Sequence, residues 1–214
     1  MSPEHARRAV CGLYAVTADT NDTHALVRDV GAAIAGGAKL VQYRNKIAAP
    51  ALRHEQAAAL TAFCTSRGAA LIVNDFVEVA RAVGAHGVHI GKDDGALENA
   101  RVMLGPDKLV GVSCYRSLEL AQAAQDGGAD YVAFGSFFPS QVKPGAVRAP
   151  IELLLEARRK LTVPVVAIGG ITADNGGQLV AAGADALAVI TAVFGAADVK
   201  SAARAFSPLF GGAQ

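Results

Sequence analysis

The sequence has no tryptophan, only three cysteines and few charged residues for its 214 positions. Cys11, Cys64 and Cys114 lie far apart and form no Cys-x-x-Cys pair, which indicates reduced thiols in a cytosolic protein and argues against a disulfide framework. Charged residues make up 18% of the chain, the net charge is +1, and no basic tail or stripe occurs. This composition excludes a general nucleic-acid or membrane-surface binder.

Long apolar segments are also missing. The first ten residues, MSPEHARRAV, lack the apolar core of a signal peptide, and the longest apolar run, around ALAVITAVFGAA, is short and broken by glycine. We therefore expect a soluble, cytoplasmic protein with no membrane partner. No linker or shift in composition divides the chain, so we predict one domain over residues 1–214.

Short apolar runs rich in β-branched residues predict eight strands. These runs are Leu13–Val16, Leu40–Tyr43, Ala70–Val73, Gly87–Ile90, Leu109–Val112, Tyr131–Phe134, Val165–Ile168 and Leu187–Ile190. Each run is almost continuously apolar, as in parallel strands that are covered on both faces. Ala-rich segments with helical spacing lie between them. Pro50 and Ser117 stand at predicted helix starts, and Gly68 and Gly127 at predicted helix ends.

A repeated pattern supports alternating helices and strands. AGGAKLVQYR, VGAHGVHIG, GGADYVAFG and AGADALAVI each read as a helix end, Gly-Ala, one or two residues and an apolar strand. Glycine allows the left-handed turn that returns the chain to the sheet. Eight such units predict an α/β fold, a (β/α)8 TIM barrel. A doubly wound open sheet is the alternative, although no G-x-G-x-x-G follows the first strand.

Polar residues follow the carboxyl ends of the predicted strands, the rim that carries the active site of a barrel. The cations Arg44, Lys46 and Lys143 lie on loops that the barrel brings together, and they suit phosphate oxygens. Asp75 and Asp94 end neighbouring strands and would repel each other without a cation between them. Because Mg²⁺ takes one or two carboxylates together with substrate phosphate, the set predicts a diphosphate ester bound through magnesium.

A second phosphate site is predicted at the AIGGI segment and Thr172. There, glycines allow close approach of the backbone, and amides are expected at the start of a helix.

Each feature also has a structural explanation. Asn74-Asp75 can cap a helix, Asp93-Asp94 can form a solvated turn, Arg44 can belong to an ion pair, and Lys143 can lie in an ordinary loop. His89 lies inside a strand and is interpreted as a hydrogen-bonded core residue. Cys114 has no base beside it in sequence and is assigned to packing.

Six segments resemble the thiamine-phosphate synthase family in order and approximate spacing. They are VQYRNK, LIVND, GVHIGKDD, VGVSCYRSLELA, GADYVAFGSFFPSQVKPGA and VPVVAIGGI, and GLYAVTAD is similar to the family's first strand. The resemblance implies a transferase that joins 4-amino-2-methyl-5-hydroxymethylpyrimidine diphosphate to 4-methyl-5-(2-phosphooxyethyl)thiazole. The reaction releases pyrophosphate and forms thiamine phosphate with Mg²⁺.

The resemblance also implies residue roles. Asp75 and Asp94 would bind the metal, and the catalytic residues would be Arg44, Lys46, Lys143 and Ser113. The implied substrate-binding residues are Gln42, Tyr43, Arg44, Asn45, Lys46, Asn74, Ser113, Ser140, Gln141, Val142, Lys143, Gly170, Ile190 and Thr191. A homo-oligomer is left open.

Three positions depart from the family pattern. Val142 stands where the family usually has a threonine hydroxyl, Lys92 replaces a common glutamine, and Asp93 replaces a common glutamate. Two other functions are weighed. A thiazole tautomerase of the same fold would not need the cations and carboxylates described above, and a non-catalytic phosphate-ligand binder would release no pyrophosphate.

Overall fold

The computed structural model describes residues 9–91, 97–140, 145 and 147–211. Its strands are β1 (Gly12–Val16), β2 (Leu40–Tyr43), β3 (Ala70–Asn74), β4 (Gly87–Ile90), β5 (Leu109–Tyr115), β6 (Tyr131–Gly135), β7 (Val165–Ile168) and β8 (Ala186–Val189). The main helices are α2 (Thr23–Ala35), α3 (Pro50–Ser66), α4 (Val77–Ala82), α5 (Leu97–Leu104), α6 (Leu118–Asp126), α7 (Glu152–Lys160), α8 (Ala173–Ala181), α9 (Thr191–Phe194) and α10 (Val199–Arg204). A 3-10 helix, η1 (Ser207–Phe210), follows α10.

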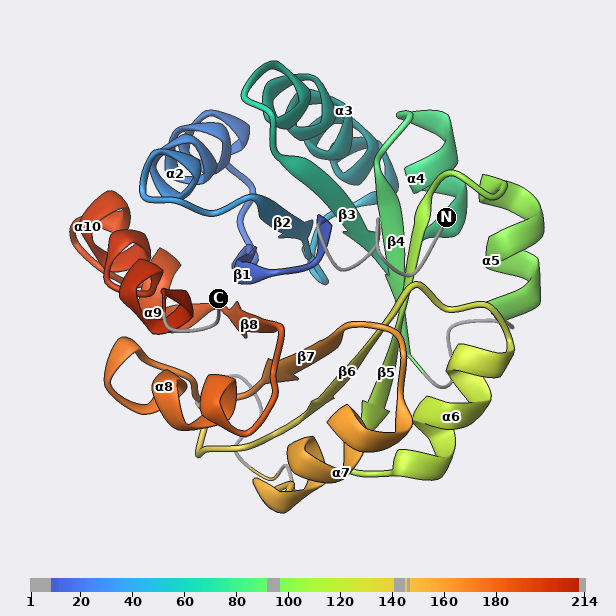
Figure 1. The fold of residues 1–214 in the computed structure, drawn as a ribbon. Coiled ribbons are helices and arrows are strands. Elements are labelled where there is room, and N and C mark those ends of the chain that lie inside the picture. The colour runs from blue at the N-terminus through green and yellow to red at the C-terminus, as the bar shows by residue number, and fades with distance from the viewer. Residues whose placement is uncertain (1–8, 92–96, 141–144, 146, 212–214) are drawn as a thin grey trace.

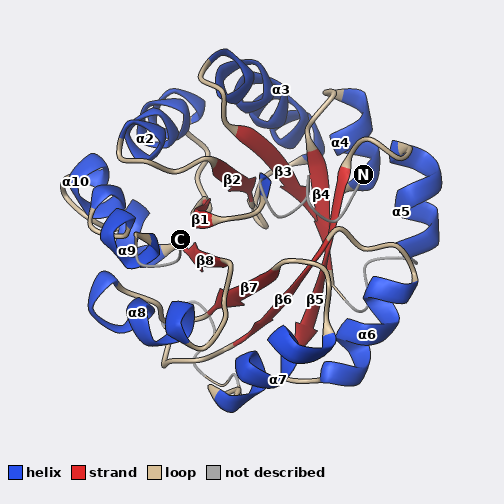
Figure 2. Ribbon diagram, in the orientation of Figure 1, coloured by secondary structure: helices blue, strands red, loops and turns tan. Residues whose placement is uncertain are grey.

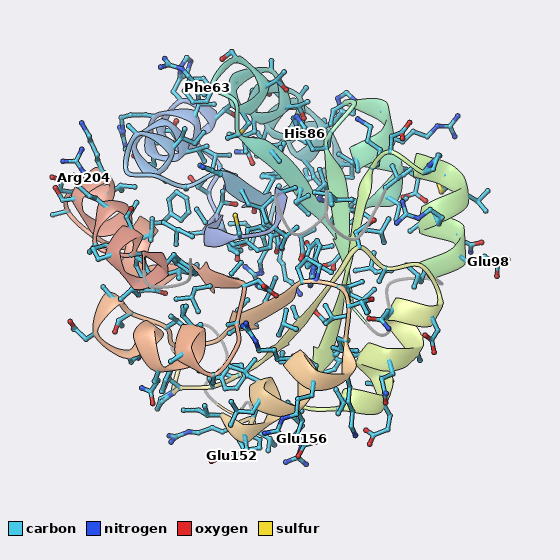
Figure 3. All side chains as sticks on the ribbon, viewed as in Figure 1. Phe63, His86, Glu98, Glu152, Glu156 and Arg204 are labelled. Carbon is cyan, nitrogen blue, oxygen red and sulfur yellow. The ribbon has the colours of Figure 1, made fainter. Side chains whose placement is uncertain are left out.

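The eight strands form one closed parallel barrel in chain order, because β1 pairs with both β2 and β8. The helices surround the strands as an outer ring (Figure 1 and Figure 2). Charged side chains of that ring, including Glu98, Glu152 and Arg204, point away from the barrel (Figure 3). The predicted (β/α)8 barrel is confirmed, and the open sheet is wrong. Within the described residues, no helix combines the length and apolar character that crossing a membrane would require.

Five strands differ from the predicted bounds. β1 begins one residue earlier, at Gly12, and β3 and β6 end one residue later, at Asn74 and Gly135. β5 and β8 differ as follows. β5 continues beyond Val112 to Tyr115, because its pairing with β6 resumes after a register shift between Ser113 and Tyr115. β8 ends at Val189, one residue early, because Ile190 caps α9. The polar residues after Val112 therefore lie on the strand itself, which places Ser113 inside the barrel mouth.

The Gly-Ala repeat forms the turns that lead from helices into strands. Gly37, Gly84, Gly128 and Gly183 all have positive φ, between 67° and 115°. After each of them the alanine N–H donates to a carbonyl five residues earlier, as Ala38 does to Ala33. The helix end near Gly127 is confirmed, but Gly127 has φ −77° and the left-handed residue is the following glycine.

The residue after three of these Gly-Ala pairs joins neighbouring strands at the amino end of the barrel. Asp130 accepts the Val110 N–H and Asp185 accepts the Val165 N–H, both at 2.8 Å. His86 has the same place in its repeat, and its Nδ1 accepts the Leu71 N–H at 3.1 Å. These side chains accept the amide of the first or second residue of the adjacent strand, where the ladder leaves a donor to be paired.

Side chains fill the inside of the barrel. Tyr14, Leu40, Ile72 and Tyr131 are at most 1% exposed and belong to one interior cluster. The Tyr131 ring occupies the space beside Gly111, where an added Cβ would lie 2.0 Å from the ring. These side chains fill the lower barrel, and a cavity opens at the carboxyl ends of the strands.

Candidate active site

A cavity of about 640 Å³ opens at the carboxyl ends of the strands, and residues from all eight strands line it. It brings together many of the residues predicted for the site: Gln42, Arg44, Lys46, Asn74, Asp75, Ser113, Ser140, Gly170, Ile190 and Thr191. Asp94, Gln141, Val142, Lys143 and the nearby Lys92 and Asp93 lie outside the described residues. Gly91 and Ser140, which immediately precede those two segments in sequence, line the cavity.

The loop after β2 is held by the loop after β1. The fully buried Thr17 hydroxyl accepts the Arg44 N–H at 2.9 Å and donates to the Arg44 carbonyl at 3.0 Å. Asp19 Oδ1 accepts the Lys46 N–H at 2.8 Å and pairs with Arg44 Nη1 at 3.3 Å. Arg44 therefore belongs to an ion pair, the structural role considered for it from the sequence. It also lines the cavity. These bonds hold the Arg44 guanidinium and the backbone of Lys46 in place.

Tyr43 and Asn45 do not line the cavity. The Tyr43 hydroxyl donates to Gln56 Oε1 at 2.8 Å, and burial raises the pKa of Tyr43 to about 12. Asn45 donates to the same Gln56 oxygen and to the Thr20 carbonyl, and its own oxygen accepts the amides of residues 47 and 48. Successive side chains of β2 point to opposite faces, so Gln42 faces the cavity and Tyr43 faces the helices. We omit Tyr43 and Asn45 from the proposed site.

Asp75 has a strained backbone at the cavity edge. Its φ of 67° is left-handed, a conformation that few residues other than glycine, asparagine and aspartate adopt. Its N–H donates to the His89 carbonyl at 2.8 Å, and Asn74 Nδ2 donates to its carboxylate. Neither residue caps a helix, because the residue before α4 is Phe76 and it makes no side-chain cap bond. The carboxylate is thus fixed at the cavity, which capping would not require.

His89 is a cavity residue that the sequence prediction placed in the core. It is only 7% exposed and hydrogen-bonded, as expected, yet it lines the cavity beside Ser113, with Nε2 2.9 Å from Ser113 Oγ. Counting strand alternation in GVHI would have found it, because Val88 and Ile90 face the helices and His89 must face inward.

Cys114 has the packing role assigned from sequence. It is fully buried in the core outside the barrel, and burial raises its thiol pKa to about 12. Such a thiol is not a nucleophile at neutral pH.

The loop after β6 lies directly against Gly169 and Gly170. Both glycines have positive φ, and a Cβ on Gly170 would lie 2.2 Å from the Pro139 carbonyl oxygen. Phe138 N–H donates to the Gly169 carbonyl at 2.9 Å, which joins the β6 and β7 loops. One of the backbone amides predicted for the second phosphate site already has a partner. Thr172, the N-cap residue of α8, donates its N–H to Asn175 Oδ1 at 2.8 Å. The backbone approach at Gly170 remains as the feature suited to a phosphate.

Comparison with known proteins identifies the family. The family model described as thiamine monophosphate synthase matches residues 13–193. The chain belongs to the thiamine monophosphate synthase family. Thiamine-phosphate synthase from Thiobacillus denitrificans is 55% identical over 199 residues, covering 93% of this chain and 94% of that protein. The enzyme of the same name from Azoarcus sp. is 53% identical, with 93% and 97% covered.

A solved structure gives the same family. Thiamine phosphate pyrophosphorylase from Pyrococcus furiosus superposes with a TM-score of 0.84 at 36% identity, covering 95% of this chain and 96% of that one. Membership in the thiamine monophosphate synthase family confirms the resemblance predicted from the motifs and the enzyme class that it implies.

Proposed function

We propose that the chain is a Mg²⁺-dependent thiamine-phosphate synthase. It would couple 4-amino-2-methyl-5-hydroxymethylpyrimidine diphosphate to 4-methyl-5-(2-phosphooxyethyl)thiazole, releasing pyrophosphate. The observation that carries the proposal is the convergence of Arg44, Lys46 and Asp75 on one cavity. Relatives that are about half identical over nearly the whole chain and are named for this activity support it.

Asp75, together with Asp94 from outside the described residues, would hold Mg²⁺. The Asp75 carboxylate meets the cavity with an amide donor on one of its oxygens, and carboxylate oxygen is a ligand that Mg²⁺ prefers. The described residues contain no group of three or more His, Cys, Asp or Glu side chains able to hold a metal alone. A cation that fills its other positions with substrate phosphate and water fits this donor set. When bound, the metal would supply charge neutralisation at the pyrophosphate oxygens.

The protein's cations would stabilise the leaving group. Arg44 and Lys46, with Lys143 from outside the described residues, would bind the diphosphate and neutralise the charge that develops on it. The C–O bond between the pyrimidine methylene and the diphosphate breaks, and its electron pair leaves with pyrophosphate. The thiazole nitrogen then donates its lone pair to form the C–N bond, so no protein nucleophile is required.

The opposite wall of the cavity suits the thiazole phosphate. The backbone at Gly170, the Ser140 and Thr191 hydroxyls and the apolar Ile190 line it, and Gln141 and Val142 would complete it. Apolar side chains of β7 and β8, Val166, Ile168 and Ala188, form the interior surface between the two walls. Holding both substrates in this enclosed space favours the thiazole nitrogen over water as the acceptor.

An assay for pyrophosphate tests the function. The protein is incubated with both substrates and Mg²⁺, and the released pyrophosphate and thiamine phosphate are measured together. We expect equal amounts of the two products, and none without either substrate or with excess chelator. A thiazole tautomerase or a non-catalytic phosphate-ligand binder would release no pyrophosphate, and that result would overturn the proposal.

We propose further that residues 1–214 form one domain located in the cytoplasm. The described strands close a single barrel, and the described helices pack around it.

A further inference from the structure

A chain of five hydrogen-bonded side chains crosses the floor of the cavity, and four of the five, all but Tyr131, line it. Gln42 Nε2 donates to the Tyr14 hydroxyl at 2.8 Å, and the hydroxyls of Tyr14 and Tyr131 lie 2.8 Å apart. Tyr131 Oη is 3.1 Å from His89 Nδ1, and His89 Nε2 is 2.9 Å from Ser113 Oγ. The His89 ring also stacks on Tyr131, with centroids 5.5 Å apart. The chain joins two residues predicted to bind substrate, Gln42 and Ser113.

The phenol hydroxyls of Tyr14 and Tyr131 are both protonated. Tyr14 is 1% exposed and Tyr131 is fully buried. Burial raises the pKa of both phenols well above the ordinary value, so both are protonated at neutral pH. Each hydroxyl can therefore donate one hydrogen bond and accept from its other neighbours.

Counting these protons decides which group donates and which accepts in each of these hydrogen bonds. The Tyr14 oxygen accepts from the Gln42 amide, and among the described residues its other hydrogen-bond partner is Tyr131. If Tyr131 donated to Tyr14, the Tyr14 proton would have no acceptor among the described residues, and at 1% exposure it has little access to water, which costs free energy. If Tyr14 donates to Tyr131, then Tyr131 donates to His89 Nδ1 and both phenol protons are paired. A neutral His89 must then carry its proton on Nε2 and donate to Ser113 Oγ.

We propose that Tyr131 is a positioning residue that fixes the Nε2–H tautomer of His89 and thereby makes the Ser113 hydroxyl a donor to the substrate. Because Ser113 Oγ already accepts from His89, its own proton points to the cavity, which it lines. The acceptor would be a pyrimidine ring nitrogen or diphosphate oxygen, so this part rests on the proposed function. In the opposite tautomer Ser113 would donate to His89 and offer the substrate only lone pairs.

Tyr131→Phe separates this role from packing. The variant keeps the ring that fills the space beside Gly111 and removes only the hydroxyl. Tyr43→Phe is the matched control. It removes the hydroxyl of another buried tyrosine, which donates to Gln56 at 2.8 Å and takes no part in these five linked side chains. Both variants are expected to lose some stability. Only Tyr131→Phe should change the state of His89.

Nitrogen NMR of the histidine rings measures that state without substrate. At every pH where the same spectra show a neutral His89 ring, we expect wild type and Tyr43→Phe to carry the proton on Nε2 and not on Nδ1. Tyr131→Phe should show a mixture of the two tautomers. An Nδ1-protonated His89 in the wild type, or an unchanged tautomer in Tyr131→Phe, overturns the proposal. This arm stands even if the protein proves to have another activity.

A double-mutant cycle tests the link to Ser113. Tyr131→Phe should lower kcat/KM for the pyrimidine diphosphate about tenfold, the size expected for one misdirected hydrogen bond. In a Ser113→Ala background the same change should cost less than about twofold, because the hydroxyl that it orients is gone. Additive losses would mean that Tyr131 acts only through packing and would overturn the link. Absence of pyrophosphate release by the wild type would instead contradict the proposed function.

Discussion

Arg44 meets the cavity while its guanidinium is paired with Asp19, 3.3 Å from Nη1 to Oδ1. The side chains of the pair are 15% and 32% exposed, so water screens the attraction and the pair alone contributes about 1 kcal/mol or less to stability. The same Asp19 oxygen also accepts the Lys46 N–H. Asp19 therefore matters more for the order of the loop that carries both cations than for the free energy of unfolding.

The Asp19 contacts predict a difference between two substitutions. Asp19→Ala removes both bonds and should raise KM for the pyrimidine diphosphate about fivefold to tenfold, because the cations must then be ordered by the substrate. Asp19→Asn keeps an oxygen for the Lys46 N–H and should lie closer to wild type. Steady-state kinetics with each substrate varied in turn measures this, and KM for the thiazole phosphate serves as the internal control. Equal effects of the two variants would contradict the prediction.

Asp75 allows the metal role to be separated from the backbone role. Asp75→Asn should lower Mg²⁺-dependent turnover by at least about 100-fold, since a neutral amide is a poor Mg²⁺ ligand. Asparagine tolerates the left-handed backbone at φ 67°, so the melting temperature should stay near that of wild type. Asp75→Ala should lose the same activity and an additional ~1–2 kcal/mol of stability through strain. Turnover in Asp75→Asn near the wild-type level would remove Asp75 from the metal site.

Gly170 and Gly177 form a matched pair for the second phosphate site. Gly170→Ala places a Cβ 2.2 Å from the Pro139 oxygen at φ 63° and should cost about 2 kcal/mol or more, with a raised KM for the thiazole phosphate. Gly177 lies within α8, where a Cβ would meet Leu209 at an ordinary 3.7 Å. Gly177→Ala should gain ~0.5–1 kcal/mol without changing KM. Chemical denaturation and kinetics on both variants check the contrast.

His86 predicts a pH dependence of stability. Its Nδ1 must be unprotonated to accept the Leu71 N–H, and burial, with a smaller contribution from Lys108, lowers its pKa below 6.5. The unfolded chain then binds the proton more readily than the folded one. The stabilisation is complete above about pH 7 and is lost as pH falls below 6.5 and through the lower folded pKa, by at most ~1.4 kcal/mol per pH unit.

His86→Asp removes this dependence while keeping an acceptor. Asp130 and Asp185 show that a carboxylate can accept the neighbouring strand amide at the equivalent position. We therefore expect the variant to lose less stability than wild type between about pH 7 and pH 5, as measured by urea unfolding at each pH. Parallel pH profiles for the two proteins would show that His86 does not titrate as described.

Local physics explains how much of the fold could be predicted from sequence. Apolar runs of β-branched residues gave the strands, and the Gly-Ala pairs gave the turns, because a left-handed residue after a helix depends on the local chain alone. The carboxyl ends of parallel strands must share one rim, so residues as distant as Gln42 and Thr191 could be assigned to one cavity in advance. The alternation of side chains along each strand is a further signal in the sequence, because it separates Tyr43 from Gln42 and places His89 at the cavity.

By itself, the sequence determined the barrel, the rim that carries the site and the family, because strand pattern, turn chemistry and motif order are all written along the chain. Only the tertiary structure decided how the site is held. Thr17 and Asp19 orient the Arg44–Lys46 loop, and Tyr131 meets His89 across 42 positions of sequence. Such bonds depend on the closure and register of the barrel, which fix the separation and direction of side chains to within a hydrogen bond, and no local pattern encodes that geometry.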